Sequence, residues 1–297
     1  MYHIPVLLHE CIEALQIKAD GIYIDATFGG GGHSKEILKL LSTNGKLIVF
    51  DQDPDAAINV PDDDRIIFVA ANFRHLKRFL KLHKCAQVDG ILADLGVSSY
   101  QFDTGERGFS YRFEGPLDMR MNVKEGVTAA DILNNYDEKE LQQLLSEYGE
   151  VTNAKTLAIA LVEARHRKKF VSIQDLLAVV EMHVRGNKFS YYGQVFQSLR
   201  IAVNEELTVL QEFLYQCAEV IKPGGILAVL TFHSLEERLV KNYMKKGAFD
   251  GEHVKDEFGK IYLPFKPVNK KPIEASVEEF KENTRSRSAK LRIAVRT

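Results

Sequence analysis

The 297-residue sequence lacks the features of a membrane protein or of a disulfide-stabilised one. No apolar run reaches the roughly 20 residues that a membrane-spanning helix needs. Cys11, Cys85 and Cys217 lie far apart and form no Cys-x-x-Cys pair, which indicates a reducing compartment and no zinc site. The opening stretch MYHIPVLLHECIEAL has neither a basic segment nor a small-residue cleavage site. We therefore expect a cytoplasmic protein without metal or membrane contact.

The sequence also lacks a large excess of positive or negative charge. The formal net charge is −2, which excludes nonspecific binding of polyanions by the whole chain and leaves room for local basic patches. Apolar residues make up 45% of the chain and charged residues 27%, an ordinary globular composition. The length is enough for one large domain or two smaller ones.

Strand and helix patterns alternate in the first hundred residues. Short apolar runs predict strands over 21–27, 46–51, 65–70 and 88–95. Helical spacing of apolar residues predicts helices over 33–41 and 72–82, the second with a basic outer face. Such alternation is typical of a parallel sheet with right-handed crossovers.

The pattern changes after residue 95. Polar residues 96–116 predict a loop, and the helical spacing of 128–185, with no strand between, predicts an all-helical insertion. The strand and helix pattern then returns. We expect, in order, a helix over 200–221 that ends at Gly224 and Gly225, a strand over 226–232, a helix with Ser234 as N-cap and Glu237 at capping-box spacing, loops over 247–288, and a strand over 289–297.

Four consecutive glycines, Gly29 to Gly32, separate the first predicted strand from the first predicted helix. Glycine weakens regular structure, so we expect a ligand to approach the backbone closely there. A strand, a glycine-rich turn and a helix start direct N–H groups at a ligand, and Asp51 at the end of the next strand can accept hydrogen bonds from a ribose. An adenosine-containing cofactor fits both features, and a plain tight turn is the alternative.

The carboxylates near this turn favour one cofactor over another. Asp25 precedes the glycines, where its charge would oppose a pyrophosphate but suit the cationic amino group of methionine. This favours S-adenosylmethionine over a nicotinamide dinucleotide. Asp94 ends the fourth predicted strand, and ligands of doubly wound sheets bind beyond such strand ends. Asp94 is expected to contact the cofactor or accept a proton from the substrate, and capping of a turn is the alternative.

Ten ordered blocks over nearly the whole chain resemble a known family. They are HIPVLLHE (3–10), DATFGGGGHS (25–34), DQDP (51–54), DLGVSSYQ (94–101), RGFS (107–110), GPLDMRM (115–121), YGE (148–150), FQSLRIAVNEEL (196–207), FHSLEERLVK (232–241) and RSRSAKLR (285–292). Together they resemble the bacterial 16S ribosomal RNA (cytosine-N4)-methyltransferase family. The resemblance implies an α/β fold: a class I, Rossmann-like, S-adenosylmethionine-dependent methyltransferase sheet with an inserted all-helical domain. It implies a methyltransferase domain over 1–105 and 198–297 and a substrate-binding helical domain over 106–197.

The resemblance also implies a reaction and a set of cofactor contacts. The reaction is methylation of the exocyclic N4 of a cytosine in the decoding region, with 16S ribosomal RNA or the small ribosomal subunit as partner and Asp94 as the catalytic residue. Phe73 could pack on adenine, and packing at a helix start is the alternative. The expected contacts to S-adenosylmethionine are Gly31, Gly32, His33, Asp51, Phe73, Asp94 and Gln101.

Substrate contacts follow from what this reaction requires. The cytosine must leave its stack, and Phe109 and Tyr111 could stack on it or pack the insertion instead. Asp118 and Arg120 could fix their loop as an ion pair or contact the substrate, and His233 could face the target base or cap a helix. Phosphates need cations, and two clusters could supply them: Arg165, Arg167, Lys168 and Lys169, and Arg285, Arg287, Lys290 and Arg292.

Two other functions stay open at this point. One is a Rossmann-type nicotinamide-dependent oxidoreductase, and the other is a noncatalytic assembly factor that binds ribosomal RNA. The sequence does not set the oligomeric state, for which a homodimer is one possibility.

Overall fold

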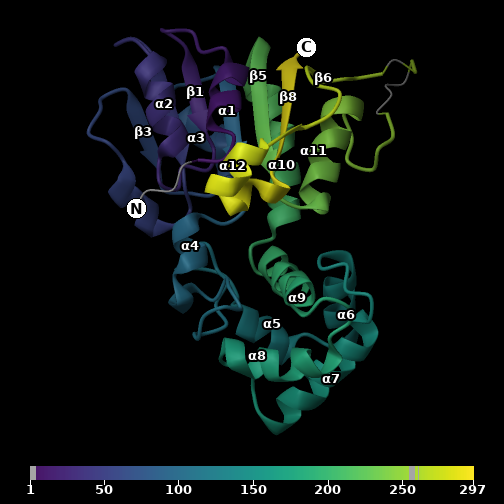
Figure 1. The fold of residues 1–297 in the computed structure, drawn as a ribbon. Helices are drawn as coiled ribbons and strands as arrows, with labels where there is room; N and C mark the ends of the chain where they lie inside the picture. Colours follow the sequence, from purple (N-terminus) through teal and green to yellow (C-terminus); the bar gives the residue numbers. More distant parts are fainter. Residues whose placement is uncertain (1–4, 254–257, 260) are drawn as a thin grey trace. The chain divides into compact units, whose positions relative to one another are not determined.

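The structure is a computed structural model that describes residues 5–253, 258–259 and 261–297 (Figure 1). It divides into two compact units. The sheet unit comprises the described residues up to Gly96 together with Leu207–Thr297, and the helical unit comprises Val97–Glu206. The divisions fall at 96/97 and 206/207 rather than at the predicted 105/106 and 197/198. The reason is that Val97, Phe102 and helix α9 (Lys188–Val203) all pack in the core of the helical unit.

Within the described residues, eight strands form one sheet in the sheet unit, in the order β3-β2-β1-β4-β5-β8-β6, with β7 paired to β8. The first five strands run parallel, and β8 is antiparallel to β5, β6 and β7. Strand order reverses beside β1, which lies between β2 and β4. The strands are β1 (Ile22–Asp25), β2 (Lys46–Phe50), β3 (Ile66–Val69), β4 (Val88–Asp94), β5 (Ile221–Thr231), β6 (Phe265–Pro267), β7 (Ile273–Glu274) and β8 (Lys290–Arg296).

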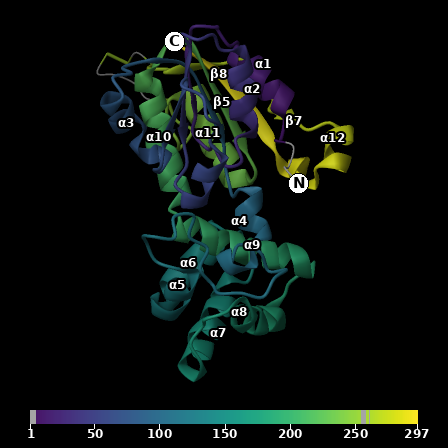
Figure 2. The same cartoon turned by 90° about the vertical axis from the view of Figure 1, so that its left-hand side faces the viewer.

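Helices cover both faces of this sheet, because side chains of each buried strand alternate between two apolar cores. Ile24 and Ile48 point into the core made with α3, α10 and α11, while Tyr23 and Leu47 point into the core made with α1 and α2. Figure 2 shows α3 and α10 next to each other. The helices of this unit are α1 (Leu8–Leu15), α2 (Gly32–Leu40), α3 (Leu76–Leu82), α10 (Glu206–Val220), α11 (Ser234–Lys246) and α12 (Val277–Glu282), with 3-10 turns η1 (Pro54–Asn59), η2 (Phe73–His75) and η5 (Thr284–Ser288).

The helical unit has its own apolar core. Capping boxes fix four of its helix starts, at Ser98, Thr128, Asp137 and Ser172, where the side chain three positions on returns the hydrogen bond. The elements are α4 (Ser99–Asp103), η3 (Gly105–Arg107), α5 (Ala129–Asn135), α6 (Glu138–Glu147), α7 (Ala154–Arg167), α8 (Ile173–Val180), η4 (Glu181–His183) and α9. The expected fold, a class I methyltransferase sheet with an inserted all-helical domain, is confirmed.

The single helix predicted over 200–221 is wrong. Helix α9 ends at Val203, and Glu205 adopts a left-handed conformation with φ of 49°, so α10 starts anew at Glu206. The predicted helix cap at Gly224 is also wrong. Strand β5 already begins at Ile221 and passes through the Lys-Pro-Gly-Gly stretch, and an irregularity opposite Val88 and Gly90 accommodates the extra residues.

Smaller elements occupy segments predicted as loops. Helix α4 and turn η3 lie within 96–116, and β6, β7, α12 and η5 lie within 247–288. The predicted N-cap Ser234 is the first residue of α11, and His233 holds the cap position. Among the described residues, no helix combines the length and apolar character needed to cross a bilayer.

Candidate active site

Three carboxyl groups stand at the ends of adjacent parallel strands. Asp25 is the last residue of β1, Asp51 directly follows β2, and Asp94 is the last residue of β4. Because β1 pairs with both β2 and β4, the three side chains share the carboxyl edge of the sheet where strand order reverses. The structure thus brings the predicted Asp51 and Asp94 together, with Asp25 between their strands.

Asp51 holds the glycine-rich turn through its carboxylate. Its Oδ2 atom accepts a hydrogen bond from the Gly29 N–H at 2.7 Å, and its Oδ1 atom accepts one from the Asp53 N–H at 2.8 Å. Burial raises the pKa of Asp51 to about 6, against the lowering effect of these two N–H groups. Each carboxylate oxygen has a second lone pair, which leaves acceptor capacity for a ligand hydroxyl.

The glycines of this turn are required for different reasons. Gly31 has φ of 72°, and a Cβ there would lie 2.8 Å from the Phe28 ring. At Gly32 a Cβ would lie 2.1 Å from Cγ of Pro5. The group that approaches Gly32 closely is therefore a side chain of the protein and not the ligand that was predicted. At Gly30, by contrast, a Cβ would meet no atom of the described residues within 4 Å. Of these three glycines, Gly30 borders open space that a ligand could fill.

Asp25 is a buried carboxyl group with two donors. The Ser34 hydroxyl donates to its Oδ2 atom at 2.6 Å, and the Thr27 N–H donates to its Oδ1 atom at 3.1 Å. Burial raises the pKa of Asp25, and the interactions with His33, Ser34 and Thr27 oppose that rise. Ser34, in the first turn of α2, was missed as a site residue although it closes the DATFGGGGHS block.

His33 points toward Asp94. Its Nε2 atom lies 3.1 Å from the Val6 carbonyl oxygen, and since a carbonyl can only accept, Nε2 carries the proton. The unprotonated Nδ1 atom then lies 3.9 Å from Oδ2 of Asp94. Burial lowers the pKa of His33, which favours this neutral ring.

One carboxyl oxygen of Asp94 receives no hydrogen bond from the described residues. Its backbone N–H donates to the Thr27 hydroxyl oxygen at 2.7 Å, which fixes the strand end. Its Oδ1 atom is enclosed and has no hydrogen-bond partner among the described residues, although about 26% of the side chain is exposed. Burial, and after it the charges of Asp25 and Glu236, raise the pKa of Asp94 to about 8. An enclosed carboxyl group of this kind suits a cation or an N–H donor.

His233 follows β5, the strand next to β4. Its Nε2 atom lies 3.2 Å from Oε1 of Glu236, whose Oε2 atom accepts the Phe232 N–H at 2.9 Å. Neither ring nitrogen of His233 has a hydrogen-bond partner within the described part of the chain, so the contact with Glu236 is one of charge proximity. The predicted capping acid was Glu237, but Glu236 reaches back to the backbone instead, and Glu237 pairs with Arg292. Glu236 is therefore a residue that sequence reasoning missed.

Phe73 occupies a position that fits its structural alternative, and Gln101 takes part in a helix cap. The Phe73 ring packs edge-on against Phe213, with centroids 4.9 Å apart, in the turn that leads into α3. The Gln101 side chain accepts from the Ser98 N–H in the capping box of α4, within the helical unit. Contacts of either residue with a cofactor stay predictions.

The predicted base-stacking residues lie in the helical unit. Phe109 is 5% exposed and belongs to its apolar core. Tyr111 is half-buried among Tyr192 and Phe196, and it stacks on the 63%-exposed Phe189, with ring centroids 6.3 Å apart. Both predicted residues therefore pack the insertion, and Phe189, which was not predicted, offers an open aromatic face.

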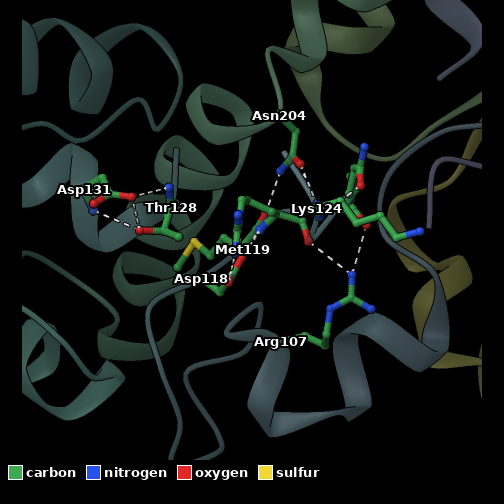
Figure 3. A network of polar contacts seen from close by, with 10 residues as sticks. Arg107, Asp118, Met119, Lys124, Thr128, Asp131 and Asn204 are labelled. Atoms are coloured by element: carbon green, nitrogen blue, oxygen red, sulfur yellow. Dashed lines mark hydrogen bonds and ion pairs between the residues drawn. The ribbon is translucent and has the colours of Figure 1, made fainter. Parts of the chain in front are cut away.

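A polar network fixes the loop that contains Asp118 and Arg120 (Figure 3). The two side chains form the expected ion pair, with Nε to Oδ1 at 2.9 Å and Nη2 to Oδ2 at 2.8 Å. Asn204 accepts from the Met121 N–H at 2.8 Å and donates to the Met119 carbonyl at 2.8 Å. Arg107 donates to the carbonyls of residues 120 and 121, both at 3.1 Å. The predicted ion pair is confirmed, and Asn204 and Arg107 tie its loop to the rest of the unit.

Several of the cations predicted to bind phosphates serve the fold instead. Arg165 donates to the carbonyls of Leu133 and Tyr136 at the end of α5. Lys168 pairs with Asp175 at 2.6 Å, and the buried Arg292 pairs with Glu237. Arg167, Lys169 and Arg287 are exposed, and Arg287 lies over the Phe280 ring at 6.0 Å. Arg285 and Lys290 are half-buried.

Comparison with known proteins decides between the open functions. The model of the MraW methylase family matches residues 1–297. The chain belongs to the MraW methylase family. It is similar to Ribosomal RNA small subunit methyltransferase H of Phocaeicola vulgatus, with 52% identity over 99% of this chain and 97% of the relative. It has the same identity to the protein of that name from Cytophaga hutchinsonii, over 100% of both chains.

As a member of the MraW methylase family, the protein is an S-adenosylmethionine-dependent methyltransferase. Neither a nicotinamide-dependent oxidoreductase nor a noncatalytic factor is favoured. The residues of the sheet edge fit a cationic adenosyl ligand. Acceptors on Asp51 suit a ribose, and the unsatisfied Oδ1 of Asp94 suits a positive or N–H-bearing group.

Proposed function

We propose that the protein methylates the exocyclic N4 of a cytosine in the decoding region of 16S ribosomal RNA. Membership of the MraW methylase family and 52% identity to ribosomal RNA small subunit methyltransferases support the substrate. The observation that carries the chemistry is the enclosed, unsatisfied Oδ1 atom of Asp94 at the reversal point of the sheet. An acceptor there can hold an amino group in place.

S-adenosylmethionine, when bound, supplies an electrophilic methyl group. Asp51 orients the ribose through the acceptor capacity left on its carboxylate, and Gly30 gives the ligand room beside the turn. Asp25, held by Ser34 and Thr27, adds negative charge at the same edge. Gly31, Gly32, Phe73 and Gln101 complete the cofactor contacts that we propose.

Asp94 acts on the target amine. The N4 lone pair of cytosine is delocalised into the ring, so the amine must be held and drawn toward tetrahedral geometry before it can attack. The Asp94 carboxylate accepts a hydrogen bond from one N–H of the amine. As the N–C bond forms, the methyl–sulfur bond would break with its electron pair left on the sulfur of S-adenosylhomocysteine, and Asp94 then takes the N–H proton. Holding the reactants in line contributes up to about 7–11 kcal/mol to such a reaction. His33 lies beside Asp94, and His233, which lies beside Glu236, contacts the base in this proposal.

The helical unit supplies substrate contacts in this proposal. The ion pair of Asp118 and Arg120 lies in the loop that follows the aromatic residues 109 and 111, and the open ring of Phe189 can stack on an unpaired base of the RNA. Arg285 and Arg287 supply phosphate contacts. The partner is 16S ribosomal RNA or the small ribosomal subunit, and the reaction takes place in the cytoplasm.

The test is methyl transfer to small subunits isolated from a strain that lacks the gene, followed by mass spectrometry of the nucleosides. We expect N4-methylcytidine at one position and its loss with Asp94→Asn. A methylated carbon of the base, or no methylation by the wild-type protein, would contradict the proposal. Titrations with S-adenosylhomocysteine and NADH form the control, and only the former should bind.

A further inference from the structure

The helices α3 and α10 of the sheet unit border an open depression of roughly 660 Å³. The two helices lie side by side in Figure 2. Cations from η2 and α3 line one wall, and residues of α10 line the other. Those used below are Arg74, Lys77, Arg78, Lys81, Glu212 and Tyr215.

Cross-helix bonds fix the walls of this groove in place. Arg74 forms a two-point ion pair with Glu212, with Nε to Oε2 at 2.8 Å and Nη2 to Oε1 at 3.0 Å. Gln216 accepts from the Lys77 N–H at 2.9 Å and donates to the Arg74 carbonyl at 2.6 Å. The groove is therefore preformed, and binding in it requires little ordering of the protein.

Two cations of the groove have no counter-charge. Lys77 pairs with Glu219, as Arg74 does with Glu212. Arg78 and Lys81 are exposed, and within the described ranges no carboxylate forms an ion pair with either. The groove thus has uncompensated positive charge, which attracts an anionic partner.

An aromatic ring adjoins these cations. Tyr215 is 53% exposed. Its ring makes edge contacts with the rings of Tyr243 and Phe249, at centroid distances of 5.3 and 5.0 Å, and these contacts fix its position. A fixed, half-open ring beside unpaired cations is the arrangement that binds single-stranded nucleic acid, by stacking a base and contacting phosphates. A chain-wide charge of −2 means that such binding must be local.

We infer that the α3–α10 groove binds a single-stranded segment of the substrate RNA, with phosphates on Arg78 and Lys81 and a base on Tyr215. This rests on the proposed function, because the RNA is the substrate of that reaction. The groove adds an anchor on the sheet unit itself. It adds to the contacts proposed for Arg285 and Arg287 of the same unit, whereas Arg165, Lys168 and Arg292, also predicted as phosphate contacts, are bound to their own chain.

The experiment compares variants for RNA binding as a function of salt. The probes are a fluorescent single-stranded RNA of about 16 nucleotides and small subunits from a strain lacking the gene. The test variants are Arg78→Glu combined with Lys81→Glu, and Tyr215→Leu. The charge-matched control combines Lys46→Glu with Lys266→Glu, two exposed lysines outside the groove. Tyr215→Phe is the control that keeps the ring.

We expect the double variant to bind the RNA about tenfold or more weakly and the slope of log affinity against log salt to fall by about 1.4. Tyr215→Leu should weaken binding about 5- to 150-fold, and Tyr215→Phe and the lysine control should match the wild type. Affinity for S-adenosylmethionine and the melting temperature should be unchanged in the double variant.

Two results would overturn the inference. One is wild-type affinity and salt slope in the double variant while the wild-type protein methylates small subunits, which leaves the proposed function standing. The other is loss of subunit binding with unchanged oligonucleotide binding, which would assign the groove to a ribosomal protein. Failure of the wild-type protein to methylate would instead count against the proposed function.

Discussion

His33 and Asp94 face each other at the carboxyl edge of the sheet, with Nδ1 of His33 3.9 Å from Oδ2 of Asp94. The Val6 carbonyl keeps the proton of His33 on Nε2, so Nδ1 presents a lone pair. Burial lowers the pKa of His33 and raises that of Asp94 to about 8. Both groups are therefore mostly neutral at pH 7 in the free protein, and Asp94 can take up a proton from the substrate only after it has ionised.

The first prediction concerns the pH dependence of catalysis. Because kcat/KM reports ionisations of the free enzyme, kcat/KM for S-adenosylmethionine should rise as the pH passes through the Asp94 pKa of about 8. Asp94→Asn should lower kcat by about 10²–10⁴-fold. Initial rates over a pH series measure both. Asp53→Asn, at the same edge, is the control, and a variant at Asp94 that keeps full activity would refute the role.

The second prediction concerns stability. The folded pKa of Asp94 lies above the unfolded value of about 3.9, so its contribution to stability is fully present below pH 4 and is lost as the pH rises through 8. Asp94→Asn, which cannot ionise, should match the wild type in acid and exceed its stability above pH 8 by about 5–6 kcal/mol. Urea unfolding at both ends of the range measures this. Equal stability throughout would mean that Asp94 is not buried as described.

The third prediction compares two glycines of the turn, Gly30, which borders open space, and Gly31, which packs against the protein itself. Gly30→Ala meets open space and should leave stability within about 0.5 kcal/mol of the wild type, yet weaken S-adenosylmethionine binding. Gly31→Ala requires φ of 72° beside the Phe28 ring and should destabilise the protein itself. Thermal melts with and without ligand distinguish the two. Normal ligand affinity in Gly30→Ala would place the cofactor elsewhere.

The fourth prediction concerns the network of Figure 3. Asn204→Ala removes the side chain that bridges residues 119 and 121, and it should lower the free energy of unfolding by about 2–3 kcal/mol. The control Asn122→Ala removes one local bond to the Lys124 N–H and should cost less than about 1 kcal/mol. Chemical denaturation compares them. Equal effects would mean that the network does not fix the loop.

The sequence predicted those features that depend on local pattern. Short apolar runs predicted the parallel strands, and the positions of Asp25, Asp51 and Asp94 near strand ends predicted that all three lie at one edge, as found. The ion pair of Asp118 and Arg120 was predictable because the residues lie two apart in one loop.

Features that depend on distant contacts were not predictable in this way. The approach of Pro5 to Gly32 joins a segment with no regular pattern to the glycine turn. The break at Glu205 depends on a left-handed backbone in an otherwise helical stretch. Glu236 rather than Glu237 caps the end of β5 because Arg292, from the last strand, binds Glu237.

The most direct test of the central claim is the pH dependence of binding for S-adenosylmethionine and S-adenosylhomocysteine, measured by calorimetry. The two ligands share the amino group and the ribose and differ by the sulfonium charge, so the ratio of their affinities isolates the interaction of that charge with the carboxyl edge. The ratio should shift toward S-adenosylmethionine as Asp94 ionises near pH 8, and this shift should vanish in Asp94→Asn. A ratio that is independent of pH, or a shift that persists in Asp94→Asn, would contradict the account.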